Sequence, residues 1–454
     1  MKITLLNPAN GEPLPPYEQW GAEKIERALK SAAAAVPIWR NTPLQMRCEH
    51  LQRVAANLRR RRDELALTIS EEMGKLIGEA EAEVDKCATL CDYTVEHAAS
   101  QLADTSVSSD AQRSYLTYQP LGTLLAIMPW NFPLWQLFRA AVPALAAGNT
   151  VLLKHASNVP RSAANIASLF CSAGFPDGVL INLPVSATAV AGIIGDPRIA
   201  AVTFTGSTSV GRQIAATAAA ALKPAVLELG GADPFIVLED ADLEFTITQA
   251  LRSRFINCGQ SCIAAKRFIV IESIADRFVS AFAAAIAALR TGDPLNRHTT
   301  LAPLARGDLR DTLAQQVAHS LAHGGELIVG GDSVKRAGFF YQPTLIDRVT
   351  PEQAAWHEEL FGPVATVIRV NNEREALQVA NQSRFGLGGS VWCGDRERGE
   401  RLARQLQCGS AFVNGMVKSD PRLPFGGVKD SGYGRELAEL GIRAFVNCKT
   451  VWIG

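Results

Sequence analysis

The stretch TLLAIMPWNFPLWQLFRAAVPALAAGNTVLLK, residues 123–154, decides the fold. It opens and closes with short apolar runs, and the residues between them carry apolar side chains at helical spacing as far as Gly148. A short apolar run bounded by turn residues is typical of a buried strand, and glycine commonly follows the last turn of a helix. The stretch therefore predicts a strand, a helix and a second strand.

The same alternation continues as far as the double glycine at 230 and 231. Helices are expected at 159–174, 187–195 and 207–222, and strands at 179–184, 200–205 and 225–229. Five strands that alternate with four helices are typical of right-handed βαβ crossovers on a parallel sheet. In such sheets ligands bind beyond the carboxyl ends of the strands.

The flanking sequence extends this unit on both sides. The first hundred residues carry long amphipathic helical patterns, and a second alternating α/β block follows residue 231. Two isolated strands, near 112–120 and at the C-terminus, are expected to pair with each other or with a second subunit. The fold class is therefore α/β, with a doubly wound parallel-sheet domain at 1–108 and 122–226, a second α/β domain at 227–425, and a β arm from 109–121 and 440–454.

Composition narrows the class of protein. The chain has 454 residues, of which 47% are hydrophobic, and its 45 basic residues balance its 45 acidic ones. A chain of this length and apolar content folds around a globular core. Because its net charge is zero, it has no overall electrostatic field that would attract nucleic acid or an anionic membrane. The nine irregularly spaced cysteines, with no visible signal peptide or apolar run of membrane-spanning length, favour a reducing, cytoplasmic setting.

Three side chains at strand-to-loop junctions carry chemistry. Asn131 lies between Pro129 and Pro133, so its amide is held in a rigid turn and can donate to a developing oxyanion. Glu228 lies one residue from the end of an apolar strand that is followed by two glycines, a position that suits a partly desolvated base. Cys262 follows a Gly-Gln turn that allows backbone N–H groups to point toward the thiol.

Six motifs occur in an order and spacing that resemble the aldehyde dehydrogenase superfamily, most of all its succinate-semialdehyde dehydrogenase branch. They are PWNFP, FTGSTSVG, LELGG, FxNxGQxCxAxxR, EELFGPV and PFGGVKDSGYGRE, and the match runs from residue 7 to the end. The resemblance implies that the thiolate of Cys262 attacks an aldehyde, that Asn131 and the Cys262 N–H hold the oxyanion, and that Glu228 activates the water that hydrolyses the thioester.

The resemblance also implies that the domain at 1–108 and 122–226 binds NAD or NADP, although a G-x-G-x-x-G fingerprint is absent. Gly206 and Ser207 open a helix, where backbone donors suit a phosphate; plain capping by Ser207 is compatible with this. The expected cofactor-binding residues are Trp130, Lys154, Ser157, Gly206, Ser207, Leu229, Glu359 and Phe361.

The cofactor residues depart from the family pattern at one position. Many relatives carry an acidic residue three positions after the lysine, whereas Ser157 stands there in this chain. A missing carboxylate removes repulsion against a 2′-phosphate and leaves Lys154 free to pair with it. We therefore expect NADP to be accepted, alongside NAD.

The substrate is predicted from charge. A semialdehyde with a distal carboxylate requires a cation, and Arg139 stands where succinate-semialdehyde enzymes place one arginine. Their second arginine would fall on Ile256. Ser419 is expected to supply a hydroxyl, with Lys418 or Arg422 compensating in charge, and the alternative for Arg139 is helix packing. With one guanidinium instead of two, we expect weaker discrimination in favour of carboxylates.

Several alternatives accompany this interpretation. The substrate could be another semialdehyde or a neutral aldehyde, and the chain could be an acyl-transferring or hydrolytic thiol enzyme, or a catalytically silent binding relative. No metal site is expected, and a regulatory disulfide between Cys258 and Cys262 stays open. The small-molecule aldehyde is the expected partner, and the β arm predicts a homodimer or homotetramer.

Overall fold

Residues 123–228 fold into a parallel sheet in the computed structural model, which describes residues 2–454. Its strands are β5 Thr123–Met128, β6 Thr150–His155, β7 Leu180–Asn182, β8 Ile199–Thr205 and β9 Ala225–Glu228. They lie in the order β9-β8-β5-β6-β7, all parallel, and the short strand β19 (Gly432–Tyr433) adds an antiparallel edge beside β9. The strand order reverses direction between β5 and β8, which is the topological switch point where such sheets bind ligands.

Helices cover both faces of this sheet, as the alternation predicts. Consecutive residues of β5 belong to different cores: Leu124 and Ala126 to one, Leu125 and Ile127 to the other. The first core is shared with α2 Leu44–Arg60, α3 Arg62–Met73, α4 Ile77–Gln101, α5 Trp135–Ala146 and α6 Pro160–Ser172. The second is shared with α1 Ala22–Asn41, α7 Val190–Gly195, which follows the 3₁₀ turn Ala187–Ala189, and α8 Thr208–Ala220.

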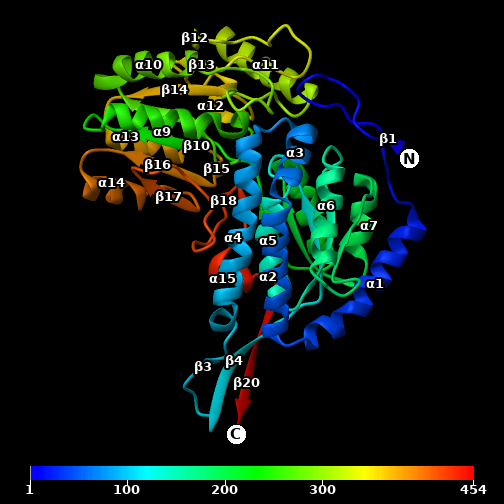
Figure 1. Ribbon diagram of the computed structural model, residues 1–454. Coiled ribbons are helices and arrows are strands. Elements are labelled where there is room, and N and C mark those ends of the chain that lie inside the picture. The colour runs from blue at the N-terminus through cyan, green and yellow to red at the C-terminus, as the bar shows by residue number, and fades with distance from the viewer. Residues whose placement is uncertain (1) are drawn as a thin grey trace.

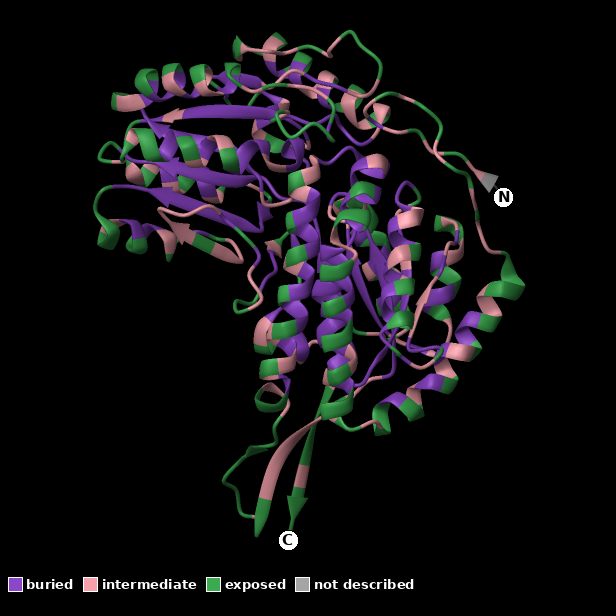
Figure 2. Cartoon of the chain, viewed as in Figure 1, coloured by how far each residue is buried: buried purple, intermediate pink, exposed green. Residues whose placement is uncertain are grey.

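A second sheet forms the other large unit (Figure 1). Its strands, in spatial order, are β12 Glu326–Val329, β13 Thr344–Asp347, β14 Val364–Val370, β11 Ala265–Ile271, β10 Asp233–Val237, β16 Gly388–Trp392 and β17 Ser410–Val413. All neighbours are parallel except β12 and β13. Its helices are α9 Leu243–Phe255, α10 Glu272–Ala287, α11 Gly307–Ala322, α12 Ala354–His357, α13 Glu373–Asn381 and α14 Arg396–Ala403. Figure 2 shows the central strands of both units as buried, whereas the edge strands β7, β12 and β17 are half-buried or exposed.

The two isolated strands pair with each other. Strand β4 (Arg113–Pro120) lies antiparallel to β20 (Val446–Ile453), and β3 (Thr105–Ser106) adds to the far side of β4. This ribbon extends away from both units, and its residues are half-buried or exposed (Figures 1 and 2). Three short pairs complete the chain: β1 (Lys2–Ile3) with β2 (Tyr17–Glu18), β15 (Phe385–Gly386) with β18 (Val428–Lys429), and β19 with β9.

The structure differs from the sequence prediction at the edges of the units. Helix α11 and strand β13 have no expected counterpart; α11 buries only Leu313, Val317 and Ser320, a stripe too narrow to recognise in the sequence. The ribbon gains a third strand, β3, ahead of β4, and helix α15 (Ala438–Ile442), which packs against α4 and α5, precedes its last strand β20. The domain boundaries otherwise stay predictions. No helix in residues 2–454 is long and apolar enough to cross a membrane.

Candidate active site

A cavity of about 570 Å³ lies where the two units meet. Helices α4 and α5 form one wall, and α9 with the loop after it forms another. Cys262 lines this cavity together with the aromatic rings of Phe132, Trp135 and Phe425. A thiol at the wall of an apolar cavity is placed to react with a small organic molecule.

The loop that carries Cys262 has a strained backbone. Asn257, Cys258 and Gly259 all have left-handed conformations, with φ values of 52°, 55° and 72°. Two of these residues have a Cβ, and such a conformation persists only where the surroundings enforce it. The fully buried Arg254 does so, because its guanidinium donates to the carbonyls of Gly259 and Leu360 at 3.2 and 3.0 Å.

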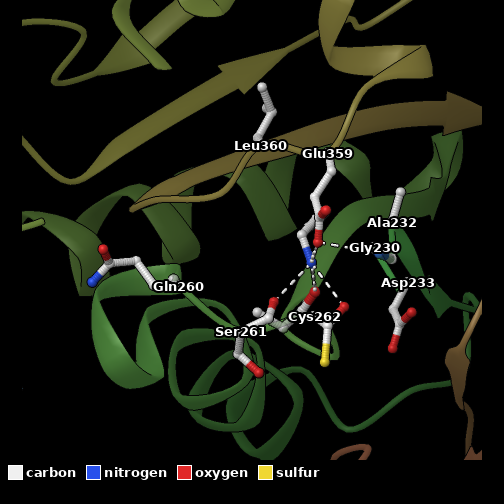
Figure 3. A network of polar contacts seen from close by, with 12 residues as sticks. Gly230, Ala232, Asp233, Gln260, Ser261, Cys262, Glu359 and Leu360 are labelled. Atoms are coloured by element: carbon white, nitrogen blue, oxygen red, sulfur yellow. Dashed lines mark hydrogen bonds and ion pairs between the residues drawn. The ribbon is translucent and has the colours of Figure 1, made fainter. Parts of the chain in front are cut away.

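A buried lysine holds the other side of this loop. The Nζ of Lys266 donates to the carbonyl oxygens of Ser261 and Cys262 at 2.9 and 3.0 Å and lies 3.5 Å from the carboxylate of Glu359. Figure 3 shows these carbonyls and the Glu359 carboxylate in one polar network, with the Cys262 sulfur pointing away from it. The backbone of the nucleophile is therefore anchored while its thiol stays outside the network.

The double glycine after β9 allows these groups to approach closely. A Cβ on Gly231 would lie 2.4 Å from the Cys262 carbonyl oxygen, and one on Gly230 would lie 2.5 Å from Glu359 Oε2. The Gly231 N–H also donates to Glu359 Oε1 at 3.1 Å. Any side chain at these two positions would displace either the nucleophile loop or Glu359.

Asn131 is held against the same loop. Its Nδ2 donates to the Gln260 carbonyl at 2.9 Å, and the Asn257 amide donates back to the Asn131 carbonyl at 2.8 Å. An amide nitrogen carries two N–H groups, so one hydrogen bond to Gln260 leaves the second available. The side chain of Asn131 is thereby fixed next to the nucleophile loop, as its turn predicts.

Two residues that the sequence did not single out position the Asn131 turn. The buried carboxylate of Glu83 accepts from the backbone N–H groups of Leu134 and Trp135 at 2.8 and 3.0 Å, at the N-terminus of α5. His155 Nε2 lies 2.8 Å from the Pro133 carbonyl, and burial lowers the pKa of this imidazole to about 4. A neutral His155 with its proton on Nε2 satisfies that contact. Both residues meet the turn only in the tertiary structure.

Glu228, the last residue of β9, is 2% exposed. Its pKa is raised to about 8, first by burial and then by the nearby carboxylate of Glu436, against the opposing positive charge of Arg139. Burial also raises the pKa of the Cys262 thiol to about 12, against the lowering effect of Arg139 and Lys266. The site thus combines a thiol and a carboxyl group that are both largely protonated at neutral pH.

Arg139 and Ser419, the two residues predicted to bind substrate, both line the cavity. The Nε of Arg139 lies 2.8 Å from Glu436 Oε2 in a buried ion pair, and its guanidinium lies 4.6 Å from the Phe425 ring centroid. Ser419 accepts hydrogen bonds from Lys86 Nζ and Trp135 Nε1, both at 2.9 Å. Lys86 is a further cavity cation, which the sequence reasoning missed because a lysine on an amphipathic helix usually faces solvent.

Of the compensating charges considered for the substrate, Lys418 lines the cavity but is exposed, and Arg422 pairs with Asp420 at 2.7 Å. Cys258 and Cys262 are both free thiols that contact different hydrophobic cores. The regulatory disulfide therefore has no support in the structure.

The predicted cofactor residues lie at or beyond the carboxyl ends of the strands of the first sheet, except Glu359 and Phe361, which lie on the loop of the second unit between α12 and β14. Trp130 and Phe361 meet edge to face with ring centroids 5.8 Å apart. Leu229 is buried under α8, where it lies so close to Gly211 that a Cβ there would meet it at 2.3 Å. Ser157 is exposed beyond the end of β6. These residues border the edge of the sheet where parallel α/β folds bind ligands.

Two features fit a nicotinamide dinucleotide. Lys154 is largely buried, which lowers its pKa, and in the described chain its ammonium has neither an ion-pair nor a hydrogen-bond partner. Ser207 is the N-cap of α8, next to Gly206, but its hydroxyl makes no capping hydrogen bond. An unpaired cation and a helix N-terminus with free donors suit the phosphates and ribose of such a cofactor.

Together, the doubly wound sheet and the cavity lined by a cysteine fit a dinucleotide-dependent enzyme with a candidate cysteine nucleophile. The model of the aldehyde dehydrogenase family matches residues 1–451, and the chain belongs to this family. It is an NAD(P)-dependent aldehyde dehydrogenase.

The chain is similar over nearly its full length to several named relatives. It is 49% identical to succinate semialdehyde dehydrogenase [NAD(P)+] Sad of Escherichia coli, over 98% of this chain and 97% of that one. It is 46% identical to a probable succinate-semialdehyde dehydrogenase [NADP(+)] of Synechocystis, over 100% of both. A solved structure of succinic semialdehyde dehydrogenase from Streptococcus pyogenes with NADP+ superposes with a TM-score of 0.97, at 38% identity over 99% of both chains.

Proposed function

We propose that this aldehyde dehydrogenase oxidises succinate semialdehyde to succinate and accepts NADP alongside NAD. The observation that supports the substrate is the cavity beside Cys262, whose wall carries positive charge and the buried hydroxyl of Ser419. Such a wall suits an aldehyde with an anionic end, because a carboxylate that leaves water needs charged or hydrogen-bonding partners. The named activities of the full-length relatives point to the same substrate.

In the proposed mechanism, Cys262 attacks the aldehyde carbon. The free N–H of Asn131 and the backbone N–H of Cys262 hold the oxyanion, whereas Arg139 and Lys266 favour the thiolate electrostatically. When bound, the nicotinamide supplies the hydride acceptor, and Trp130, Lys154, Ser207, Glu359 and Phe361 would hold the cofactor. Loss of hydride leaves a thioester on Cys262. Glu228 in its carboxylate form then takes a proton from the water that releases the acid.

The proposed acceptance of NADP rests on Lys154 and Ser157. Lys154 provides an unpaired ammonium near the end of β6, and Ser157 places no carboxylate beside it. A 2′-phosphate would gain an ion pair there and meet no like charge.

Three further parts of the proposal rest on the sequence: the β ribbon joins subunits into a homodimer or homotetramer, the domain at 1–108 and 122–226 binds the cofactor, and the protein works in the cytoplasm.

The test is reduced-cofactor formation by the purified protein across an aldehyde panel, with NAD and NADP in separate series. We expect succinate semialdehyde to give the highest kcat/KM, NADP to support turnover, and one free acid to form per cofactor reduced. Cys262→Ala should abolish cofactor reduction, since no adduct can form. A neutral aldehyde that surpasses succinate semialdehyde would overturn the substrate, and strict use of NAD would overturn the cofactor proposal.

A further inference from the structure

The cavity wall holds a lysine that has no acidic partner. Lys86 of α4 places its Nζ 2.9 Å from the Ser419 hydroxyl and 4.1 Å from the centroid of the Trp135 ring. No carboxylate in residues 2–454 lies within ion-pair distance of this ammonium. The two nearby acids have cations of their own: Glu83 pairs with Lys75, and Asp420 pairs with Arg422.

Burial without a counter-ion is costly for this ammonium. Burial lowers the pKa of Lys86 to about 8, and the positive charge of Arg139 contributes in the same direction. A lysine ammonium has three N–H donors, and only one of them is used, toward Ser419. Lys86 therefore gains both charge compensation and hydrogen bonds when an anion enters the cavity.

The hydroxyl of Ser419 also has an unused hydrogen-bond donor. It accepts from Lys86 and from Trp135 Nε1, so both of its lone pairs are occupied. Its remaining capacity is the O–H donor, and no acceptor for it is present among the described residues. Lys86 and Ser419 together present unused donors to one cavity, which is the pattern that a carboxylate satisfies.

Arg139 is placed differently. Its guanidinium already faces the carboxylate of Glu436, and both side chains are almost fully buried, at 3% and 2% exposure. A substrate carboxylate at Arg139 would share the guanidinium with that internal anion, which already compensates its charge, although Nη2 has no hydrogen-bond partner. Lys86 has no such internal anion in residues 2–454.

We propose that Lys86 and Ser419 bind the distal carboxylate of the substrate, and that Trp135 positions Ser419 to do so. This inference rests on the proposed function, since it assigns the anionic end of the same substrate to named residues. It makes Lys86 the residue that selects for an acidic aldehyde over a neutral one. Arg139 then acts mainly on Glu436 and Glu228.

The primary test is Lys86→Met, which keeps an apolar chain over Trp135 and removes the charge. We expect the KM for succinate semialdehyde to rise roughly 10- to 100-fold, the effect of losing a charge-assisted hydrogen bond. The kcat/KM for pentanal, which lacks the carboxylate, should change less than about threefold, since Lys86 makes no contact with an apolar chain end. Pentanal turnover also shows that the variant is folded.

The comparison variant is Lys418→Met, which removes another cation from the wall of the same cavity at an exposed position. We expect a much smaller effect on succinate semialdehyde than from Lys86→Met. Equal effects of the two variants, or an equal effect of Lys86→Met on both aldehydes, would show that Lys86 does not bind the carboxylate.

An inhibition experiment separates this proposal from the identity of the substrate. 4-Hydroxybutanoate, which has a carboxylate but no aldehyde, should compete with pentanal in the wild type, and Lys86→Met should raise its inhibition constant at least tenfold. This holds even if the wild type prefers another aldehyde, an outcome that would overturn the proposed function alone. An unchanged inhibition constant would overturn the role of Lys86.

Discussion

Arg139 links the residues that determine proton transfer in the site. It forms the buried ion pair with Glu436, and its charge lowers the pKa values of Glu436, Glu228 and Cys262. Glu228 still keeps a pKa of about 8, because burial and the charge of Glu436 outweigh Arg139. The arginine predicted to bind substrate therefore also influences the protonation of Glu228, the proposed general base.

This role predicts the pH dependence of thioester hydrolysis. Glu228 works only as the carboxylate, so with its pKa at about 8 the hydrolysis rate should rise with pH and level off above that value. Arg139→Ala removes the cation that lowers this pKa. The profile should then move to higher pH, and equally for succinate semialdehyde and pentanal, because every thioester needs Glu228.

The measurement is kcat against pH for both aldehydes, under conditions where hydrolysis limits turnover. Arg139→Lys, which keeps a positive charge, should retain most of the wild-type profile. Suppose instead that Arg139→Ala leaves the profile in place and raises only the KM for succinate semialdehyde. Arg139 would then be the substrate arginine that the sequence predicts.

At the scale of elements, the turn between α9 and the nucleophile fixes the position of Cys262. It includes three left-handed residues in succession and ends at Gly259, whose φ is 72°. A Cβ on Gly259 would lie 2.2 Å from the Gly362 carbonyl oxygen, so the turn packs tightly against the loop that follows Glu359. The loop that carries Cys262 and the loop that carries Glu359 are therefore fixed against each other by this close contact.

Gly259→Ala should separate the contribution of this contact from that of backbone conformation. The matched control is Gly11→Ala, because Gly11 has a φ of 73° and a Cβ there would meet nothing within 4 Å. We expect Gly11→Ala to cost about 1 kcal/mol of unfolding free energy, the strain of a left-handed alanine. Gly259→Ala should cost roughly 3 kcal/mol or more and lower kcat, since the clash adds to the strain.

Denaturant unfolding and steady-state kinetics check this pair. If both alanine variants lost the same stability and kept full activity, the close approach to Gly362 would have no importance for the site.

At the scale of the whole molecule, the β4–β20 ribbon is the element whose two faces are not packed against the rest of the chain. The two strands pair along their full length, yet none of their residues is fully buried. Trp452 and Ile453 near its tip are 56% and 41% exposed. A ribbon with two solvated faces is marginally stable alone, so its length and its exposed apolar residues favour contact with another subunit.

We therefore expect the wild-type protein to sediment as a multiple of 48.7 kDa. Trp452→Lys should shift the population toward smaller species, because it places a charge in the proposed subunit contact. Leu222→Lys is the matched control, since Leu222 is 93% exposed and lies outside the ribbon, after α8. Monomeric wild-type protein, or the same shift from both variants, would contradict the role of the ribbon in assembly.

The sequence by itself determined the α/β class, the parallel sheet at 123–228, the turn that carries Asn131 and the strand that carries Glu228. Each follows from local information: alternating strand and helix periods, and the polar or glycine residues that end each strand. Cys262 instead follows helix α9 and a glycine turn, and it precedes strand β11. The pairing of the two isolated strands was one of two options in the sequence, and the structure chose between them.

Only the tertiary structure decided how the charges are partnered. Arg139 pairs with Glu436, whereas Lys86 meets Ser419 across 333 positions of sequence. The contact between His155 and the Pro133 carbonyl, which supports the Asn131 turn, likewise cannot be predicted from the order of residues along the chain. Local periodicity tells which face of a helix is buried, but it does not tell which distant group faces a given cation. That depends on how α4, α5 and the C-terminal loop pack around one cavity.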